Sequence, residues 1–510
     1  MKVNQLKWGT VLSYLSLFLG TLVSLLYTPV MLQRLGQSEY GVYNLVLPVV
    51  SYLNLLSFGL GSAYTRYYSR YKVEEDRAAI ARLNGMFLVL YSFLGTLVLL
   101  IGCFLAEHVE FLFGSKLTGD ELALSRVLMY ILSVNAALSF PISVFESNVM
   151  VNEQYLFQKL VAMGKTVFNP LLMIPLLLMG FRSVAMTVLT LVFTVLSGVL
   201  NIAYCLRVLK MRFLFRRFDM ALMREMFSYT SYVFISILVD QLNWSVDKLL
   251  LGRFHGTSAV AVYTVASQLN LYFMSMSTAL SNILTPKIHR MVASGASNRQ
   301  LTALFTRVGR LQFLVLSAIL IGFVAVGQPF VIKWSGGAAY APAFWMALLL
   351  MVPTVIPSIQ TIGIEIQRAK NMHKFRSVVY LGVAVFNILL SIPLSMKWQG
   401  IGASAGTAVS VLLGNGLLMN WYYQKYIGLD IRRFWKKIGL LLPSLLLPLI
   451  AALLIATLAP VSGWGGIVLW GCVIVAVFLP SVWLLGMNRY EKELVREPLR
   501  SLARRLRRHH

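Results

Sequence analysis

Charged side chains inside long apolar stretches are the residues of this chain most able to do chemistry. Asp240 and Lys165 lie deep in such stretches. If the stretches cross a membrane, each charge costs about 2.5–3.5 kcal/mol to insert, so each suggests a function. Asp240 is a candidate site for a proton or a sodium ion, or a partner to a cation, and Lys165 is a candidate contact for an anion. The alternatives are a buried pair that only fixes packing for Asp240, and a Lys165 that extends along its own stem toward the interface.

Three further charges lie toward one end of their apolar stretches. Arg66 is a candidate contact for an anion at entry, or else a simple topological anchor. Glu146 and Glu365 occupy equivalent places in the two halves of the chain. We expect them to close an inner gate by pairing with Arg66, Arg368 or Lys370; the alternative is that each is an isolated carboxylate at the interface.

Four charges lie toward the opposite ends of such stretches. Arg126 is a candidate cavity cation, and Asp247, Lys248 and Arg253 are candidates for an outer gate. Asp247 and Lys248 are adjacent and so project in different directions from a helix, which argues against a pair between them. Anchoring at the interface is the alternative for all four.

The sequence holds no pattern typical of an enzyme or a metal site. Gly164-Lys165-Thr166 resembles the end of a P-loop, but Lys159 occupies the position of the required glycine and no strand precedes it. The six histidines lack metal-ligand spacing, and the three cysteines all lie in apolar runs. We therefore expect no catalytic residues, no metal and no cofactor, with H⁺ or Na⁺ as the candidate coupling ion.

The elements that position these charges are long apolar helices. The chain is 58% hydrophobic and only 13% charged, and its mean hydropathy is +0.73. A soluble domain is nearer half apolar and a quarter charged, so lipid must be the solvent. A spanning helix needs about 20 apolar residues. Fourteen stretches qualify, with limits near 10–33, 40–65, 83–106, 122–147, 158–179, 183–206, 228–252, 258–285, 311–332, 340–364, 377–396, 400–423, 438–459 and 463–487.

Basic residues predict how these spans are oriented. With the N-terminus in the cytoplasm, 36 of the 45 Lys and Arg residues fall in cytoplasmic segments, six in outer segments and three within spans. This bias predicts a multi-pass protein of the cytoplasmic membrane with both termini inside. It also explains the net charge of +26 by contact with anionic lipid headgroups rather than nucleic acid. Residues 488–510 are predicted to form a basic amphipathic helix on the inner leaflet, the alternative being a frayed tail.

An internal repeat divides the chain. Residues 167–176 and 385–394 share eight of ten positions at an offset of 218, and Gly41-Val42-Tyr43 matches Ala261-Val262-Tyr263 at 220. We predict two parallel six-helix lobes, 1–220 and 221–430, followed by two additional helices within 431–487 and the basic tail at 488–510. Parallel repeats related by an axis along the membrane normal are typical of transporters.

Several segments in a fixed order resemble one known family. They are LGQSEYGVY at 35–43, FGLG at 58–61, Arg66-Tyr67, DKLLLG at 247–252, VAVY at 260–263 and GIGASAGT at 400–407. The chain resembles the polysaccharide transporter family, which includes the Wzx-type oligosaccharide flippases of the multidrug/oligosaccharidyl-lipid/polysaccharide flippase superfamily. The resemblance implies an all-α, V-shaped, MATE-like fold that moves polyprenyl-pyrophosphate-linked oligosaccharide across the cytoplasmic membrane by alternating access.

The resemblance also implies partners and roles. Lys165 is the first choice for contact with the pyrophosphate, together with Arg66 and Arg126, and polymerases or glycosyltransferases of the same pathway are expected partners. Three alternatives stay open: a lipid II-type flippase, a drug/cation antiporter of the same fold, and a membrane-embedded polymerase or ligase. The uncharged first span argues against the lipid II-type flippase, and the two extra spans argue against the drug antiporter. The short outer loops argue against the polymerase or ligase.

Overall fold

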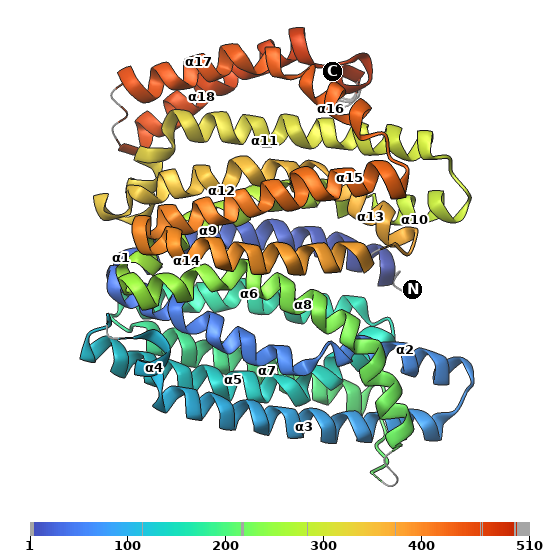
Figure 1. The fold of residues 1–510 in the computed structure, drawn as a ribbon. Coiled ribbons are helices and arrows are strands. Elements are labelled where there is room, and N and C mark those ends of the chain that lie inside the picture. The colour runs from blue at the N-terminus through green and yellow to red at the C-terminus, as the bar shows by residue number, and fades with distance from the viewer. Residues whose placement is uncertain are drawn as a thin grey trace, which may run out of the picture. The chain divides into compact units, whose positions relative to one another are not determined.

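The computed structural model describes residues 5–114, 116–215, 219–282, 284–372, 374–459, 461, 463–493 and 496, and within them the chain is all-helical (Figure 1). The main helices are α1 (Gln5–Leu53), α2 (Leu60–Val73), α3 (Arg77–Glu107), α5 (Gly119–Val151), α6 (Tyr155–Leu178), α7 (Ser183–Arg207), α8 (Met220–His255), α9 (Thr257–Asn282), α11 (Asn298–Ser335), α12 (Pro342–Ile359), α14 (Lys374–Val411), α17 (Leu442–Leu458) and α18 (Gly463–Ser481). Shorter helices are α4 (Val109–Phe113), α10 (Thr285–Ala293), α13 (Thr361–Ala369), α15 (Asn420–Tyr422) and α16 (Ile431–Gly439), and five further short helical segments, η1 to η5, complete the order.

Many breaks between helices fall at residues whose backbone φ angle is positive. Gly36 (φ 74°) interrupts α1, and Gln399 (φ 51°) interrupts α14. Positive φ is costly for any residue but glycine, so such positions mark turns that the surrounding structure imposes. Positive-φ residues recur in six pairs spaced 218–222 apart: Gly36 and Gly256, Glu75 and Gly295, Gly114 and Gly336, Glu153 and Asn371, Gly180 and Gln399, and Lys210 and Gly428. The same backbone breaks therefore occur twice along the chain.

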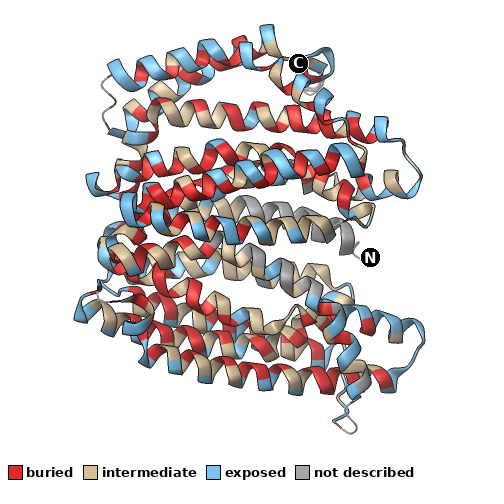
Figure 2. Cartoon of the chain, in the orientation of Figure 1, coloured by how far each residue is buried: buried red, intermediate tan, exposed pale blue. Residues whose placement is uncertain are grey.

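The exposed surface of the helices is apolar. Nine helical segments of the described residues are long and apolar enough to cross a membrane, or ten when the bent pair α16 and α17 counts as one span. In residues 463–486 only 28% of the most apolar window is buried inside the protein (Figure 2). Helices that expose so much apolar surface, with their backbone groups paired internally, are stable in lipid. The protein is therefore an all-α membrane protein.

The helices differ from the predicted spans in several places, including the span at 340–364 and the pair at 228–252 and 258–285. Within the predicted span at 340–364, α12 ends at Ile359 and α13 begins at Thr361. Pro353 and Pro357 lie inside α12, where each removes a backbone donor. The predicted spans at 228–252 and 258–285 lie within α8 and α9 and the turn after them, but neither helix is among the nine apolar segments of the described residues. Both helices carry many polar residues for membrane helices.

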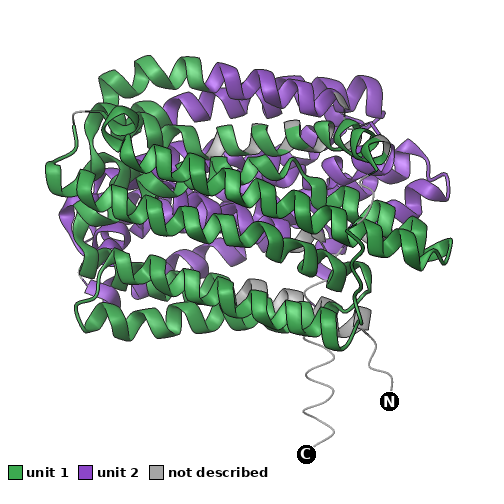
Figure 3. Ribbon diagram, turned by 90° about the horizontal axis from the view of Figure 1, so that it is seen from below, with its two compact units in different colours: residues 1–264, 388–403 green, residues 265–387, 404–510 purple. Residues whose placement is uncertain are grey.

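The chain divides into two compact units, residues 1–264 with 388–403, and residues 265–387 with 404–510 (Figure 3). In the first unit α5 packs against α3 and α7, and α1 packs against α6. In the second unit α11 packs against α12, α16, α17 and α18. The buried core there includes Leu314 and Ile321 of α11, Leu445 of α17 and Phe478 of α18.

Close contact between α1 and the start of α9 gives a stability prediction. A Cβ at Gly41 would collide with the backbone carbonyl of Thr257, and overpacking of this kind costs about 1–3 kcal/mol. We expect Gly41→Ala to lower the apparent Tm of the purified protein in detergent. Gly322→Ala, in the middle of α11 with open space around the new methyl group, is the control and should not lower it. Equal Tm values for the two variants would contradict this packing.

Candidate functional site

A lysine near the middle of α6 is the centre of a polar cluster inside the first unit. The Lys165 ammonium donates a hydrogen bond to Thr194 Oγ1 of α7 at 3.1 Å. The Glu146 carboxylate of α5 lies within electrostatic range of that ammonium. Both charged side chains are half-buried. The structure thus brings together two residues that the sequence analysis assigned to different roles, the candidate anion contact and a candidate inner gate.

The sequence analysis missed Thr194, which orients the lysine. Thr194 donates to the carbonyl of Thr190, and Thr190 donates to the carbonyl of Met186. Its oxygen therefore points a lone pair at the Lys165 ammonium. Thr187, Thr190 and Thr194 are spaced three and four residues apart, which places them on one face of α7. This threonine stripe was a usable signal in the sequence.

A second polar network involves Asn148 and Asn152, two and six residues after Glu146. Asn148 of α5 donates to the Tyr64 hydroxyl at 2.8 Å, and that hydroxyl donates to Asn84 Oδ1 at 2.7 Å. Asn152 donates to Tyr68 at 3.0 Å and accepts from Lys72 at 3.1 Å. Satisfied polar networks of this kind hold helices in one register. We infer that this network holds α2, α3 and α5 together; it was not among the sequence predictions.

The other two candidate cavity cations lie apart from Lys165. Arg126 pairs with Glu107 at 3.8 Å, and both side chains are about half exposed. Arg126 and Glu146 are 20 residues apart on α5, or about 30 Å along a helix. Arg66 is exposed on α2, and its guanidinium lies 5.9 Å from the ring centroid of Tyr67. One phosphate group cannot reach Arg126 and the Lys165–Glu146 cluster together.

The candidate residues of α8 have separate environments. Asp247 is buried and accepts a hydrogen bond from the Tyr263 hydroxyl of α9 at 2.6 Å. Arg253 is exposed and donates to the backbone carbonyl of Phe111 at 3.0 Å. Lys248 is partly buried in the same helix. Asp240 belongs to α8, but its side chain is not among those that the structure describes.

The second inner-gate candidate, Glu365, has different partners from those of Glu146. On α13 it accepts from Arg368 Nη1 at 2.8 Å and lies 3.8 Å from His289 Nε2 of α10. Arg368 is one of the three partners that the sequence analysis named. Lys370, another of the three, instead donates to Asn298 and to the Ile427 carbonyl, each at 2.8 Å.

The segment at 35–43 has a structural role at the opposite end of the first unit. Glu39 is buried and accepts from the backbone N–H of Ser183 at 2.8 Å, at the start of α7. Ser38 and Thr257 both donate to Glu121 Oε1 at 2.5 Å, and Glu121 forms a capping box with Thr118. The pattern Thr-x-x-Glu before an apolar run is a sequence signature of a helix start, so this junction was also predictable.

The arrangement can bind an anion but shows no metal site. An ammonium held by a neutral hydroxyl and a single carboxylate keeps N–H donors for an oxyanion. In the described part of the chain, no group of three or more His, Cys, Asp or Glu residues is placed to hold a metal ion.

Known protein sequences resemble this chain. A family profile described as polysaccharide biosynthesis protein matches residues 6–292. A Shigella flexneri protein named as an O-antigen transporter is 20% identical over 413 residues, covering 79% of this chain and 94% of that protein. The teichuronic acid biosynthesis protein TuaB of Bacillus subtilis is 26% identical over 115 residues, covering 22% of this chain and 23% of its own.

Solved structures share the fold. The lipid II flippase MurJ in an inward closed conformation aligns with a TM-score of 0.75 at 16% identity, covering 96% of this chain and 99% of its own. An inward-facing multidrug resistance MATE transporter of the MOP superfamily aligns with a TM-score of 0.65 at 14% identity, covering 82% of this chain and 96% of its own. At these identities the likeness concerns the fold alone.

Proposed function

The chain belongs to the polysaccharide biosynthesis protein family, and we propose that it is a flippase for polyprenyl-pyrophosphate-linked oligosaccharide, moved across the cytoplasmic membrane by alternating access. The observation that carries the proposal is the match along 94% of the protein named as an O-antigen transporter, on a fold shared with transporters. The substrate is a membrane-bound anion, so a transporter needs a cation to compensate the pyrophosphate as it leaves water.

We propose Lys165 as that cation. It lies near the middle of a 24-residue helix, where an uncompensated charge is costly, and its main partners are a neutral threonine and one carboxylate. The pyrophosphate displaces Glu146 from Lys165 when it binds, and Glu146 re-pairs with Lys165 after release. Glu146 and Glu365 would then form the inner gate of the transport path. The outer gate would be formed by Asp247, Lys248 and Arg253. Arg66 would meet the headgroup at entry.

The proposed topology has fourteen spans with both termini in the cytoplasm. The segments at residues 19–73 and 375–427 contain 55 and 53 residues, enough for two crossings each. With α8, α9 and the bent pair α16 and α17, the nine apolar segments then give fourteen spans. The six pairs of positive-φ residues support two parallel repeats, with lobes at 1–220 and 221–430, two additional helices at 431–487 and a basic tail at 488–510. Beyond residue 496 that tail lies outside the described residues.

The test is transport between leaflets in proteoliposomes. Labelled polyprenyl-pyrophosphate oligosaccharide is placed in one leaflet, and its arrival in the other is followed with a probe that cannot cross the membrane. We expect protein-dependent transport under an imposed proton or sodium gradient. Asp240→Asn should remove the dependence on the gradient while leaving slow downhill exchange. Rates equal to those of protein-free liposomes would refute the flippase proposal.

Lipid II is the second candidate substrate, because the MurJ structure aligns over 96% of this chain. The same liposomes loaded with labelled lipid II separate the two candidates. We expect the oligosaccharide lipid to move faster, and a clear preference for lipid II would replace the first candidate with the second. Resistance to cationic drugs in a sensitised strain would point instead to the drug antiporter.

A further inference from the structure

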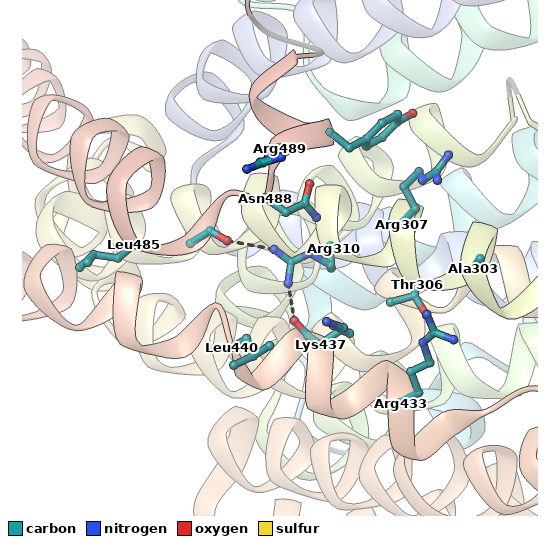
Figure 4. A pocket seen from close by; sticks show the side chains of 12 residues that line it. Ala303, Thr306, Arg307, Arg310, Arg433, Lys437, Leu440, Leu485, Asn488 and Arg489 are labelled. Carbon is teal, nitrogen blue, oxygen red and sulfur yellow. Dashed lines mark hydrogen bonds between the residues drawn. The ribbon is translucent and has the colours of Figure 1, made fainter.

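A strongly basic cavity of about 600 Å³ lies in the second unit (Figure 4). It is formed by α11, α16 and the segment that follows α18. Five cationic side chains line it: Arg307, Arg310, Arg433, Lys437 and Arg489. Five like charges around one space repel one another unless an anion sits between them. The function proposed above uses none of them.

One of the five is already neutralised. Arg310 is buried and forms a two-pronged ion pair with Glu491, at 2.6 and 3.0 Å. It also donates to the carbonyl of Gly486 at 3.0 Å, so it ties α11 to the chain after α18 (Figure 4). Among the described residues, Arg310 is the only one of the five in an ion pair. The remaining four cations are exposed and are available to a ligand.

A neutral polar group in the same cavity also lacks a partner. The Thr306 hydroxyl is buried, with 8% of the residue exposed, and has no hydrogen-bond partner in the described part of the chain. Thr306 lines the cavity between Arg307 and Arg433 (Figure 4). Buried hydroxyls nearly always form a hydrogen bond, so the Thr306 hydroxyl is a candidate hydrogen-bonding group for a ligand of this cavity. A phosphate oxygen beside two guanidinium groups would satisfy it.

An apolar groove continues from the cavity along the same elements. It has a volume of about 790 Å³ and is lined by α11, α18 and η5 (Val482–Gly486), including Val315, Ile319 and Phe478. Leu485 and Gly486 line the cavity, while Leu484 and Met487 line the groove, so the two spaces adjoin. The cations of Lys492 and Arg496 lie 5.9 and 5.2 Å from the ring of Trp483, a groove residue. A tryptophan with one apolar side and nearby cations is typical of a membrane interface.

We propose that this cavity and groove bind one anionic membrane phospholipid, with its phosphate in the cavity and an acyl chain in the groove. A free phosphate or a nucleotide would bind the cations of the cavity but would not occupy the apolar groove. A phospholipid would occupy both the cavity and the groove. The bound lipid is not the transported one. It bridges α11, α16 and the start of the basic tail, and so holds α17 and α18 against α11 within the second unit.

The test measures binding and does not depend on transport. Detergent-purified protein is titrated with phosphatidylglycerol and analysed by native mass spectrometry, with zwitterionic phosphatidylcholine in parallel. Arg433→Gln/Lys437→Gln removes two cavity cations. We expect binding of phosphatidylglycerol to weaken about 30-fold, since each basic residue contributes about 1 kcal/mol toward an anionic lipid surface. Phosphatidylcholine binding should not change.

The matched control is Arg432→Gln/Lys436→Gln. It removes the same charge from exposed positions of the same helix that do not line the cavity. Equal losses in the two double variants would overturn the site in favour of general charge attraction. A third titration uses glycerol 3-phosphate, the headgroup without its chains. If it binds as tightly as phosphatidylglycerol, the site is one for soluble phosphates and the lipid proposal fails.

Discussion

Lys165→Met is expected to slow transport of the lipid-linked oligosaccharide by at least about 30-fold in proteoliposomes. Truncating one partner of a buried charge pair costs about 2–5 kcal/mol, and here the lost partner is the cation that we propose faces the pyrophosphate. Methionine keeps the length and apolar stem of lysine, so packing between α6 and α7 should survive. The measurement is the initial rate of leaflet-to-leaflet transfer, normalised to the amount of inserted protein.

A structural role for Lys165 must be separated from contact with substrate. If the lysine only neutralises Glu146, the double variant Lys165→Met/Glu146→Gln should regain both Tm and transport. If it contacts the pyrophosphate, the double variant should regain Tm and stay inactive. Thr194→Val, which removes the hydroxyl bonded to Lys165, should give an intermediate rate. Lys159→Met, earlier on the same helix, is the matched control and should transport normally.

Arg310→Met is expected to give the largest loss of stability among single substitutions of the basic residues. Its guanidinium and the Glu491 carboxylate are 6% and 0% exposed, and breaking such a pair from one side costs about 3–5 kcal/mol because the other charge stays buried without compensation. The readout is the apparent Tm in detergent together with the fraction of monodisperse protein after heating. Detachment of the segment after α18 should accompany the loss and expose it to protease.

Two further variants test whether the broken ion pair causes the loss of stability in Arg310→Met. Arg310→Met/Glu491→Leu removes both charges and should recover most of the lost Tm, because a buried ion pair replaced by apolar groups is often neutral or stabilising. Arg307→Met, one turn earlier and exposed, should change the Tm little, since its contact is a cation–π interaction with Tyr490 at 4.2 Å. A destabilised Arg307→Met with an unchanged Arg310→Met would contradict the structure.

Much of the architecture was determined by the sequence alone. The apolar stretches locate most helices because a membrane helix must satisfy its own backbone, which leaves hydrophobic length as a strong signal. Gly180 and Gly256, which have positive φ, fall in the gaps between predicted spans, at 180–182 and 253–257. The offset of about 220 was read from matching side chains and recurs in the backbone angles, which are an independent observation. The family also followed from the sequence, and the match at 6–292 confirms it.

Only the tertiary structure decided which charges meet. Lys165 and Glu146 are 19 residues apart on different helices, and no local sequence pattern indicates that helix packing brings them together. The same holds for Arg310 and Glu491, separated by 181 residues. Helix periodicity fixes which face of one helix is polar, but the rotation and register of a neighbouring helix depend on packing along its whole length. The apolar stretches thus determined where the helices run, and packing between them determined which polar groups became partners.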